Sequence, residues 1–176
     1  MAGVALVAGL GAQAEWLAAF GDRLFVGFMH EPEDNPGPCQ PGAVGDEKAD
    51  MGSAGEFKAA WRHIVERVWP VAPNVVRVLS FMGHDPVRSW ALHPGDDVVD
   101  WVAWDPYNWA NCAGRARDTW RSLRQVAQPM YAHLDAGGNT KPRMLGEYGS
   151  HDDPAWAARS SGCASSRRPS ARPCPR

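Results

Sequence analysis

The sequence predicts an α/β fold in which a parallel sheet is covered by helices. Four short, apolar, β-rich segments alternate with segments that have helical periodicity. Continuous apolar strands that alternate with helices are typical of parallel sheets. Most of the predicted strands end at a charged or aromatic residue, and α/β proteins, (β/α)₈ barrels above all, build their active sites at the carboxyl ends of strands.

The predicted strands are short apolar runs bounded by turn residues or charges. Each contains mainly β-branched, aromatic or large aliphatic side chains, which favour a buried strand. The four segments are Leu24–Glu31, Val75–Phe81, Val98–Asp105 and Pro142–Glu147.

Two long helices are predicted between the strands. Ser53 and Glu56 have the spacing of a capping box, and Pro70 ends the apolar stripe that follows them. The second helix covers residues 120–134, where Pro129 removes one backbone donor and is expected to cause a kink. The stripe of the first helix consists of Phe57, Ala60, Trp61, Ile64, Val65, Val68 and Trp69.

The two ends of the chain differ from the middle in composition. Residues 1–14 are apolar and end in Ala12-Gln13-Ala14, which resembles a signal-peptide cleavage site but has no basic residues before it. We interpret this segment as part of a helix leading to the first strand. Residues 159–176 hold five Arg, no acid and no apolar periodicity, and are predicted to be a disordered basic tail.

Length, composition and charge exclude several classes of protein. A chain of 176 residues, 44% hydrophobic and 22% charged, corresponds to one globular domain or part of one. Residues 1–158 contain 13 basic against 20 acidic residues, a balance of −7 that argues against nucleic acid as the main partner. No apolar run has the length of a membrane span. The four Cys (39, 112, 163 and 174) lack metal-ligand spacing, so neither a metal nor a cofactor is expected.

Two glutamates are candidates for catalysis. Glu31 and Glu147 each close an apolar strand and begin a loop. Glycoside hydrolysis uses two carboxyl groups, of which one protonates the leaving oxygen and the other attacks the sugar or activates water. The plain alternative is that each glutamate is a solvated strand end.

Three motifs carry a resemblance to a known family. They are Met29-His30-Glu31, then Trp104-Asp105-Pro106-Tyr107-Asn108, and then Gly146-Glu147-Tyr148-Gly149, each at the end of a predicted strand. In this order the chain resembles the second half of the catalytic domain of glycoside hydrolase family 26, the β-mannanase type. The resemblance runs from about Asp22 to Asp153.

The resemblance implies a fold and a set of site residues. Family members are retaining (β/α)₈ TIM barrels, so the chain is expected to be a partial barrel containing strands four to seven. Glu31 then resembles the acid/base and Glu147 the nucleophile, with Tyr107 as the hydroxyl beside the nucleophile. His30, Trp104, Tyr107 and Trp109 are expected to bind substrate, and residues 1–158 form the partial catalytic domain.

The segment after Glu31 departs from the mannanase pattern. Residues 32–37 read Pro-Glu-Asp-Asn-Pro-Gly, whereas well-known members continue with Met-Asn-Gly and a Trp-rich stretch. The implied activity is that of an endo-β-1,4-mannanase acting on a β-linked polysaccharide. Alternatives are a family 26-type β-1,3-xylanase or lichenase, and a non-catalytic carbohydrate-binding remnant.

Further expectations follow from the same resemblance. The protein is expected to be secreted and, at full length, monomeric, and Cys39 and Cys112 are candidates for a disulfide in an oxidising compartment. Strands one to three would precede Met1 and strand eight would follow Ala158, so the chain is expected to be an incomplete and weakly active barrel.

Overall fold

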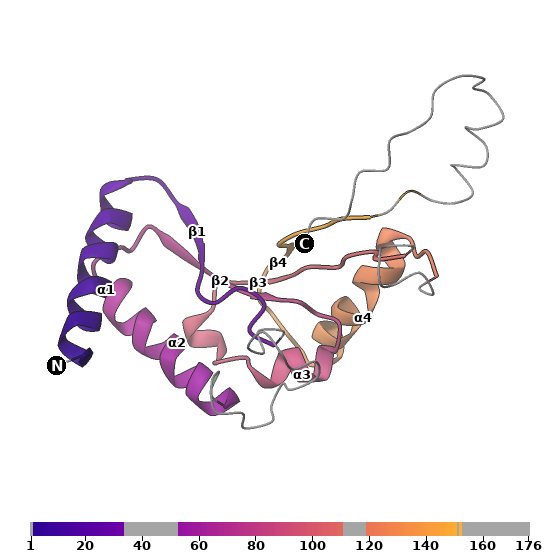
Figure 1. Ribbon diagram of the computed structural model, residues 1–176, viewed down its shortest axis with the longest axis horizontal. Helices are drawn as coiled ribbons and strands as arrows, with labels where there is room; N and C mark the ends of the chain where they lie inside the picture. The colour runs from indigo at the N-terminus through magenta and orange to yellow at the C-terminus, as the bar shows by residue number, and fades with distance from the viewer. Residues whose placement is uncertain (1, 34–52, 111–118, 151, 153–176) are drawn as a thin grey trace, which may run out of the picture.

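The computed structural model describes residues 2–33, 53–110, 119–150 and 152. Four parallel strands form one sheet in the order β1-β2-β3-β4. Figure 1 shows the helices gathered along one side of this sheet. This arrangement confirms the predicted α/β class. The strands are β1 (Leu24–Gly27), β2 (Val75–Phe81), β3 (Trp101–Trp104) and β4 (Arg143–Leu145), and the helices are α1 (Ala2–Ala19), α2 (Ala54–Val68), α3 (Pro86–Ala91) and α4 (Leu123–Ala136), with a 3₁₀ turn η1 (Asp96–Val98).

The predicted helices are present, with small shifts of their ends. Helix α1 occupies the apolar start of the chain, as expected. Helix α2 begins with the predicted capping box between Ser53 and Glu56. Helix α4 begins at Leu123, where Ser122 and Gln125 form a second capping box that was not predicted. Helix α3 was not predicted, because its single short apolar turn has no periodicity to detect.

The first and third strands are shorter than predicted. Strand β1 ends at Gly27 because Met29 and Glu31 adopt left-handed backbone conformations, with φ of 54° and 49°. The third segment begins with η1, and its strand starts only at Trp101. Periodicity shows where apolar residues gather, but it does not show where the backbone leaves the ladder.

Register assigns each strand residue to one face of the sheet. Leu79 pairs with Val102 and Phe81 pairs with Trp104, and all four side chains belong to the core between the sheet and the helices. Asp105, the next residue after Trp104, therefore points to the opposite face because side chains alternate along a strand. This alternation separates the residues of the core from those of the site described below. The remaining members of the core are Phe57, Trp61, Val65, Leu92, Val98, Val99, Met130 and Leu134.

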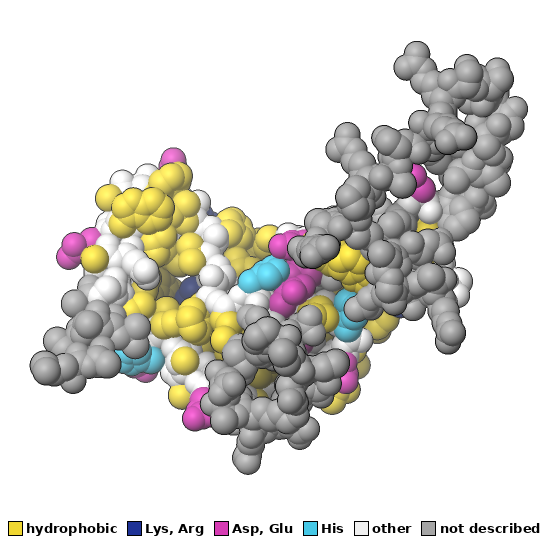
Figure 2. All heavy atoms as spheres, in the orientation of Figure 1, with side chains coloured by type: hydrophobic (Ala, Val, Ile, Leu, Met, Phe, Trp, Pro, Cys, Tyr) yellow, Lys and Arg dark blue, Asp and Glu magenta, His cyan; other side chains and the backbone are white. Residues whose placement is uncertain are grey.

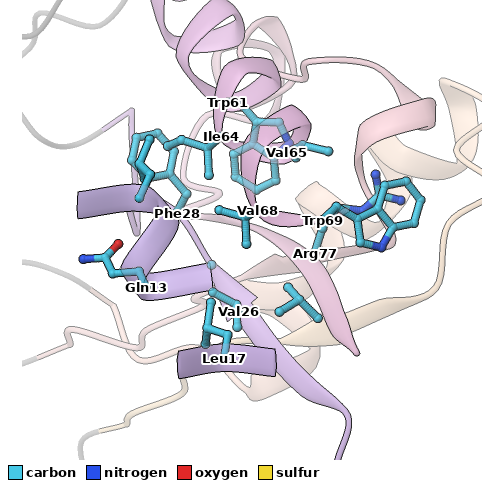
Figure 3. Close-up of a pocket in the computed structure, with 13 residues that line it drawn as sticks. Gln13, Leu17, Val26, Phe28, Trp61, Ile64, Val65, Val68, Trp69 and Arg77 are labelled. Atoms are coloured by element: carbon cyan, nitrogen blue, oxygen red, sulfur yellow. The ribbon is translucent and has the colours of Figure 1, made fainter. Parts of the chain in front are cut away.

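An apolar groove lies between α1 and α2, over β1 and the start of β2. Figure 3 shows Leu17, Val26, Phe28 and Val68 converging on it, with Arg77 at one side. The groove lies among the helices, whereas the polar strand ends lie at the carboxyl edge of the sheet. Among the described residues, no helix is long and apolar enough to span a membrane.

A histidine with a buried side chain between α3 and η1 should make the fold sensitive to acid. His93 Nδ1 accepts a hydrogen bond from the Gly95 backbone N–H at 3.2 Å. Burial holds the pKa of His93 below its ordinary value, against the opposing charge of Asp96, whose Oδ1 lies 3.5 Å from Nε2. The unfolded chain therefore binds the proton more readily than the folded one, so stability should fall as the pH drops below about 6.5.

Urea unfolding between neutral and mildly acidic pH tests this expectation. His93→Asn keeps an acceptor for the Gly95 N–H but cannot take up the proton, so its midpoint should fall less on acidification than that of the wild type. An identical pH dependence in the two proteins would assign the acid sensitivity to other groups.

Candidate active site

Three loops at the carboxyl edge of the sheet bring the candidate residues together. His30 and Glu31 follow β1, Asp105 and Tyr107 follow β3, and Glu147 follows β4. Parallel strands end at the same edge, so residues far apart in the sequence meet there. Figure 2 shows acidic and histidine side chains gathered in the middle of one face of the molecule.

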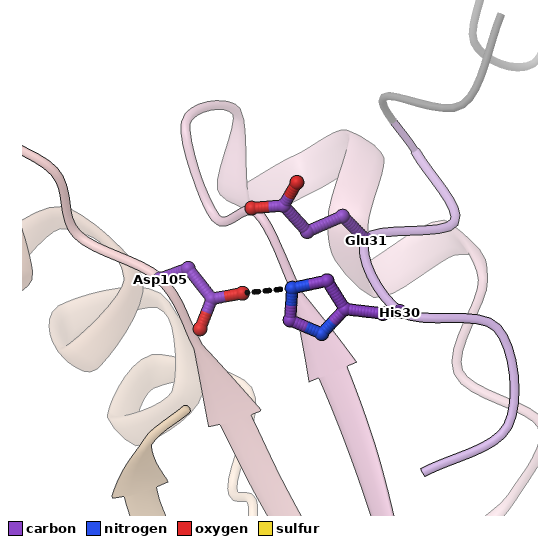
Figure 4. Close-up of side chains that lie close together, drawn as sticks. All are labelled: His30, Glu31 and Asp105. Carbon is purple, nitrogen blue, oxygen red and sulfur yellow. Dashed lines mark ion pairs between the residues drawn. The ribbon is translucent and has the colours of Figure 1, made fainter. Parts of the chain in front are cut away.

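Asp105 is the centre of the cluster. It is fully buried, and its Oδ1 accepts a hydrogen bond from the Glu147 backbone N–H at 2.6 Å. Its Oδ2 lies 3.1 Å from His30 Nε2, the ion pair drawn in Figure 4. Burial raises the pKa of Asp105, and the negative charge of Glu147 acts in the same direction. Asp105 is predicted at a strand end but without a role, because nothing in the sequence shows that this carboxyl is buried.

Glu147 is held on both of its carboxylate oxygens. Tyr107 donates its hydroxyl to Oε2 at 2.5 Å, and His30 Nε2 lies 3.3 Å from Oε1. The contact between Tyr107 and Glu147 that the resemblance implies is therefore present. The Glu147 side chain is about half exposed, so one side of the carboxylate faces solvent.

Glu31 follows β1 and brings its carboxyl group to within 4.8 Å of the ligand atoms of His30 and Asp105. Its backbone N–H donates to the Ser80 carbonyl at 3.2 Å, which extends the pairing between β1 and β2 past Gly27. Figure 4 shows its carboxyl group above the His30 ring, on the same side as Asp105. Two left-handed residues in three, Met29 and Glu31, cost on the order of 1 kcal/mol or more each, and such strain is common where a loop aims a functional side chain.

The glycines of the Gly146-Glu147-Tyr148-Gly149 motif make room for the residues that follow β3. A Cβ at Gly146 would lie 2.5 Å from Asp105 Oδ1 and 2.9 Å from Ser80 Oγ. A Cβ at Gly149 would lie 2.7 Å from the Tyr107 ring. The two motifs are thus fitted to each other, since any side chain at either glycine would push Asp105 or Tyr107 away from Glu147.

The two tryptophans predicted to bind substrate are placed differently. Trp109 stacks on Tyr107 with ring centroids 4.9 Å apart, and therefore lies beside the cluster. The prediction that Trp104 contacts substrate is wrong: its side chain is 3% exposed and belongs to the hydrophobic core. The physical reason is the strand period, which turns Trp104 towards the helices and its neighbour Asp105 towards the site.

A metal was not expected, yet part of the cluster has a geometry that could hold one. His30, Glu31 and Asp105 each offer a ligand atom, and these atoms lie within 4.8 Å of one another. His30 Nε2 already lies 3.1 Å from Asp105 Oδ2 and 3.3 Å from Glu147 Oε1, and Asp105 Oδ1 accepts a hydrogen bond from the Glu147 backbone N–H. These contacts account for the placement of His30 and Asp105. The candidate disulfide and the basic tail fall on residues outside those that the structure describes.

Comparison with known proteins finds a solved structure with a similar fold. No protein-family model matches the chain. Among solved structures, a ruminal GH26 endo-β-1,4-mannanase superposes with a TM-score of 0.59 at 19% identity, and the match covers 81% of this chain. The fold of this chain matches a part of the fold of that mannanase. At that identity the likeness concerns the fold, and it agrees with the resemblance seen in the three motifs.

One curated protein is similar to this chain in sequence. Endoglucanase H of Acetivibrio thermocellus is 28% identical over 149 residues, which cover 78% of this chain. The match spans 15% of Endoglucanase H, and the family 26 fold match spans 29% of the mannanase chain. The chain therefore corresponds to a part of each of these proteins.

Tyr107 should ionise unusually late because of its partner. Its hydrogen bond to Glu147, together with partial burial and the nearby negative charge, raises its pKa from 10.0 to about 12. Replacing Tyr107 with Phe should therefore remove the most alkaline step from a titration of tyrosine absorbance. In Glu147→Gln the same step should move back towards the ordinary value, because the charged acceptor is gone. If the step that disappears in Tyr107→Phe lies near the ordinary tyrosine pKa of 10.0, the result would contradict the hydrogen bond between Tyr107 and Glu147.

Proposed function

We propose that this chain carries the catalytic centre of a retaining glycoside hydrolase that cleaves a β-linked polysaccharide, most similar to an endo-β-1,4-mannanase. The observation that supports it best is Glu147 held by Tyr107 and His30 beside a buried Asp105, with Glu31 across the same cluster. The fold of a GH26 mannanase and the likeness to an endoglucanase support the same reaction class.

In the proposed reaction Glu147 is the nucleophile. The hydroxyl of Tyr107 and the imidazole of His30 hold its two oxygens, which leaves the carboxylate oriented before the sugar arrives. Asp105 fixes the Glu147 backbone through the N–H and fixes His30 through Nε2. One Glu147 oxygen attacks the anomeric carbon, and a covalent glycosyl-enzyme forms as the glycosidic bond breaks.

Glu31 supplies and recovers the proton. As the acid it protonates the leaving glycosidic oxygen, and as the base it then takes a proton from the water that attacks the glycosyl-enzyme. Water restores the free Glu147 carboxylate and releases the sugar with its original anomeric configuration. Two successive inversions at one carbon therefore give net retention.

The proposed substrate is a β-1,4-mannan, supported by the structural neighbour rather than by a contact in this site. A polysaccharide such as mannan is hydrolysed outside the cell, so we propose that the protein is secreted. The first test is hydrolysis of mannan, β-1,3-xylan and mixed-linkage glucan by the full-length protein encoded by the gene. Cleavage of xylan or glucan but not mannan would reassign the substrate and leave the reaction class intact.

The second test follows the anomeric configuration of the product by proton NMR during the first minutes of hydrolysis. Retention predicts that the β-anomer appears first and the α-anomer grows only by mutarotation. An α-anomer that appears first would show inversion and contradict the nucleophile assigned to Glu147. Polysaccharide binding without any hydrolysis would identify a non-catalytic binding remnant instead.

A further inference from the structure

Glu33 is an unusually placed acid two residues beyond the proposed acid/base. It is 5% exposed, although glutamate is rarely buried without compensation. Its Oε1 accepts hydrogen bonds from the Gly83 backbone N–H at 2.9 Å and from Ser89 Oγ at 2.7 Å. Its Oε2 is buried and has no hydrogen-bond partner among the described residues. A carboxylate removed from water and bound in this way is a specific tether rather than a solvated loop side chain.

The tether joins three separate elements. Gly83 lies two residues after the end of β2, Ser89 lies inside α3, and Glu33 belongs to the turn after β1. The same turn is attached to β2 at a second point, where the Glu31 N–H donates to the Ser80 carbonyl. The backbone of Glu31 is thus held at its own N–H and, two residues later, by the Glu33 side chain.

The turn needs such attachment because its backbone is strained. Met29 and Glu31 both have positive φ, a conformation that side chains with a Cβ rarely adopt. A strained turn persists only where its surroundings hold it in place. Without the Glu33 tether, the turn is free to relax Glu31 towards ordinary negative φ, which would swing its carboxyl group away from the cluster around Asp105.

We propose that Glu33 is a positioning residue for the proton transfer carried out by Glu31. The proposal rests on the proposed function, because it assigns Glu33 a task only if Glu31 is the acid/base. Misplacing a catalytic group by about 1 Å can cost on the order of 100-fold in rate. Loss of the tether should therefore impair protonation of the leaving group and leave the attack by Glu147 largely intact.

The test compares two aryl β-mannobiosides on the full-length protein. A 2,4-dinitrophenyl leaving group departs without a proton, whereas a 4-methoxyphenyl group needs the acid. In Glu33→Ala, kcat/KM for the 4-methoxyphenyl glycoside should fall by about tenfold or more, within the range that general acid catalysis contributes. For the 2,4-dinitrophenyl glycoside it should stay within about threefold of the wild type, because attack by Glu147 alone limits that step.

Two further variants keep the test decisive if Glu33→Ala does not fold. Glu33→Gln keeps an Oε1 acceptor and should recover most of the kcat/KM that Glu33→Ala loses on the 4-methoxyphenyl glycoside. Ser89→Ala removes one donor to Glu33 and should lower kcat/KM for the same glycoside by a smaller factor. Asp97→Asn is the matched control, because it weakens the Arg62 ion pair at the amino end of the strands, far from the turn. It should affect both glycosides equally.

The outcomes separate this inference from the function on which it rests. If the wild type cleaves both glycosides and the Glu33 variants lose activity equally on both, the function stands and Glu33 has only a structural role. If the folded wild type cleaves neither glycoside, nor their gluco and xylo counterparts, the proposed function fails and the inference fails with it.

Discussion

Glu147→Ala in the full-length protein is expected to lower kcat by at least about 10³-fold, or about 4 kcal/mol of transition-state stabilisation. The loss is large because the variant removes the atom that forms the covalent bond, together with the acceptor of the Tyr107 hydroxyl and the partner of His30. Binding of polysaccharide should change much less, since the rings and loops beside the cluster remain. Turnover on mannan and a binding isotherm for the same polymer measure the two effects separately.

Azide provides the control that assigns each carboxyl group its task. In Glu147→Ala a small anion can enter the space left by the carboxylate and attack the sugar, giving a glycosyl azide of inverted configuration. In Glu31→Ala the covalent intermediate still forms on Glu147, so azide should give the product of retained configuration. Near-normal turnover in Glu147→Ala, or the same azide product from both variants, would overturn the assignment.

Asp100→Ala is expected to destabilise the fold by about 3 kcal/mol or more. Arg77 is a buried guanidinium on β2, and Asp100 accepts from its Nη2 at 2.6 Å, its Nε at 2.8 Å and its backbone N–H at 2.8 Å. Removing Asp100 leaves the buried charge of Arg77 with one acceptor among the described residues, the Asp97 carbonyl, and with its stacking on Trp69. The midpoint and slope of urea unfolding at neutral pH measure the change.

Two comparisons test whether burial of the Arg77 charge causes the loss of stability in Asp100→Ala. Asp135 pairs with Arg143 at the same 2.6 Å, but its side chain is 58% exposed, so Asp135→Ala should cost no more than about 1 kcal/mol. The hydrogen bonds and charge of Arg77 also lower the pKa of Asp100. The stabilisation from Asp100 should therefore be complete near neutral pH and be lost as the pH falls through its folded pKa. Equal costs for the two alanine variants would show that burial does not strengthen the Arg77 pair.

The elements that were predicted well are those whose signals are local. Strand β2 has the predicted bounds because five of its seven residues are apolar and the segment is bounded by Asn74 and Gly83, which favour turns. Helix α2 begins at its capping box because Ser53 and Glu56 satisfy each other's backbone groups within one turn. By contrast, β1 ends four residues before its predicted end, since the left-handed turn at Met29 and Glu31 is held by contacts with β2 and α3.

The order of strands and helices, the parallel sheet and the two glutamates at strand ends could be predicted from the sequence, because each depends on neighbouring residues or on one short motif. The burial of Asp105 at the centre of the cluster, the place of Trp104 in the core and the hydrogen bonds of Glu33 to Gly83 and Ser89 became visible only in the folded chain. These facts depend on which face of the sheet a side chain takes and on which distant element covers it. Burial and partners of this kind arise only when segments some 50 to 75 residues apart pack together, as Glu33 does with Gly83 and Ser89, or Asp105 with His30.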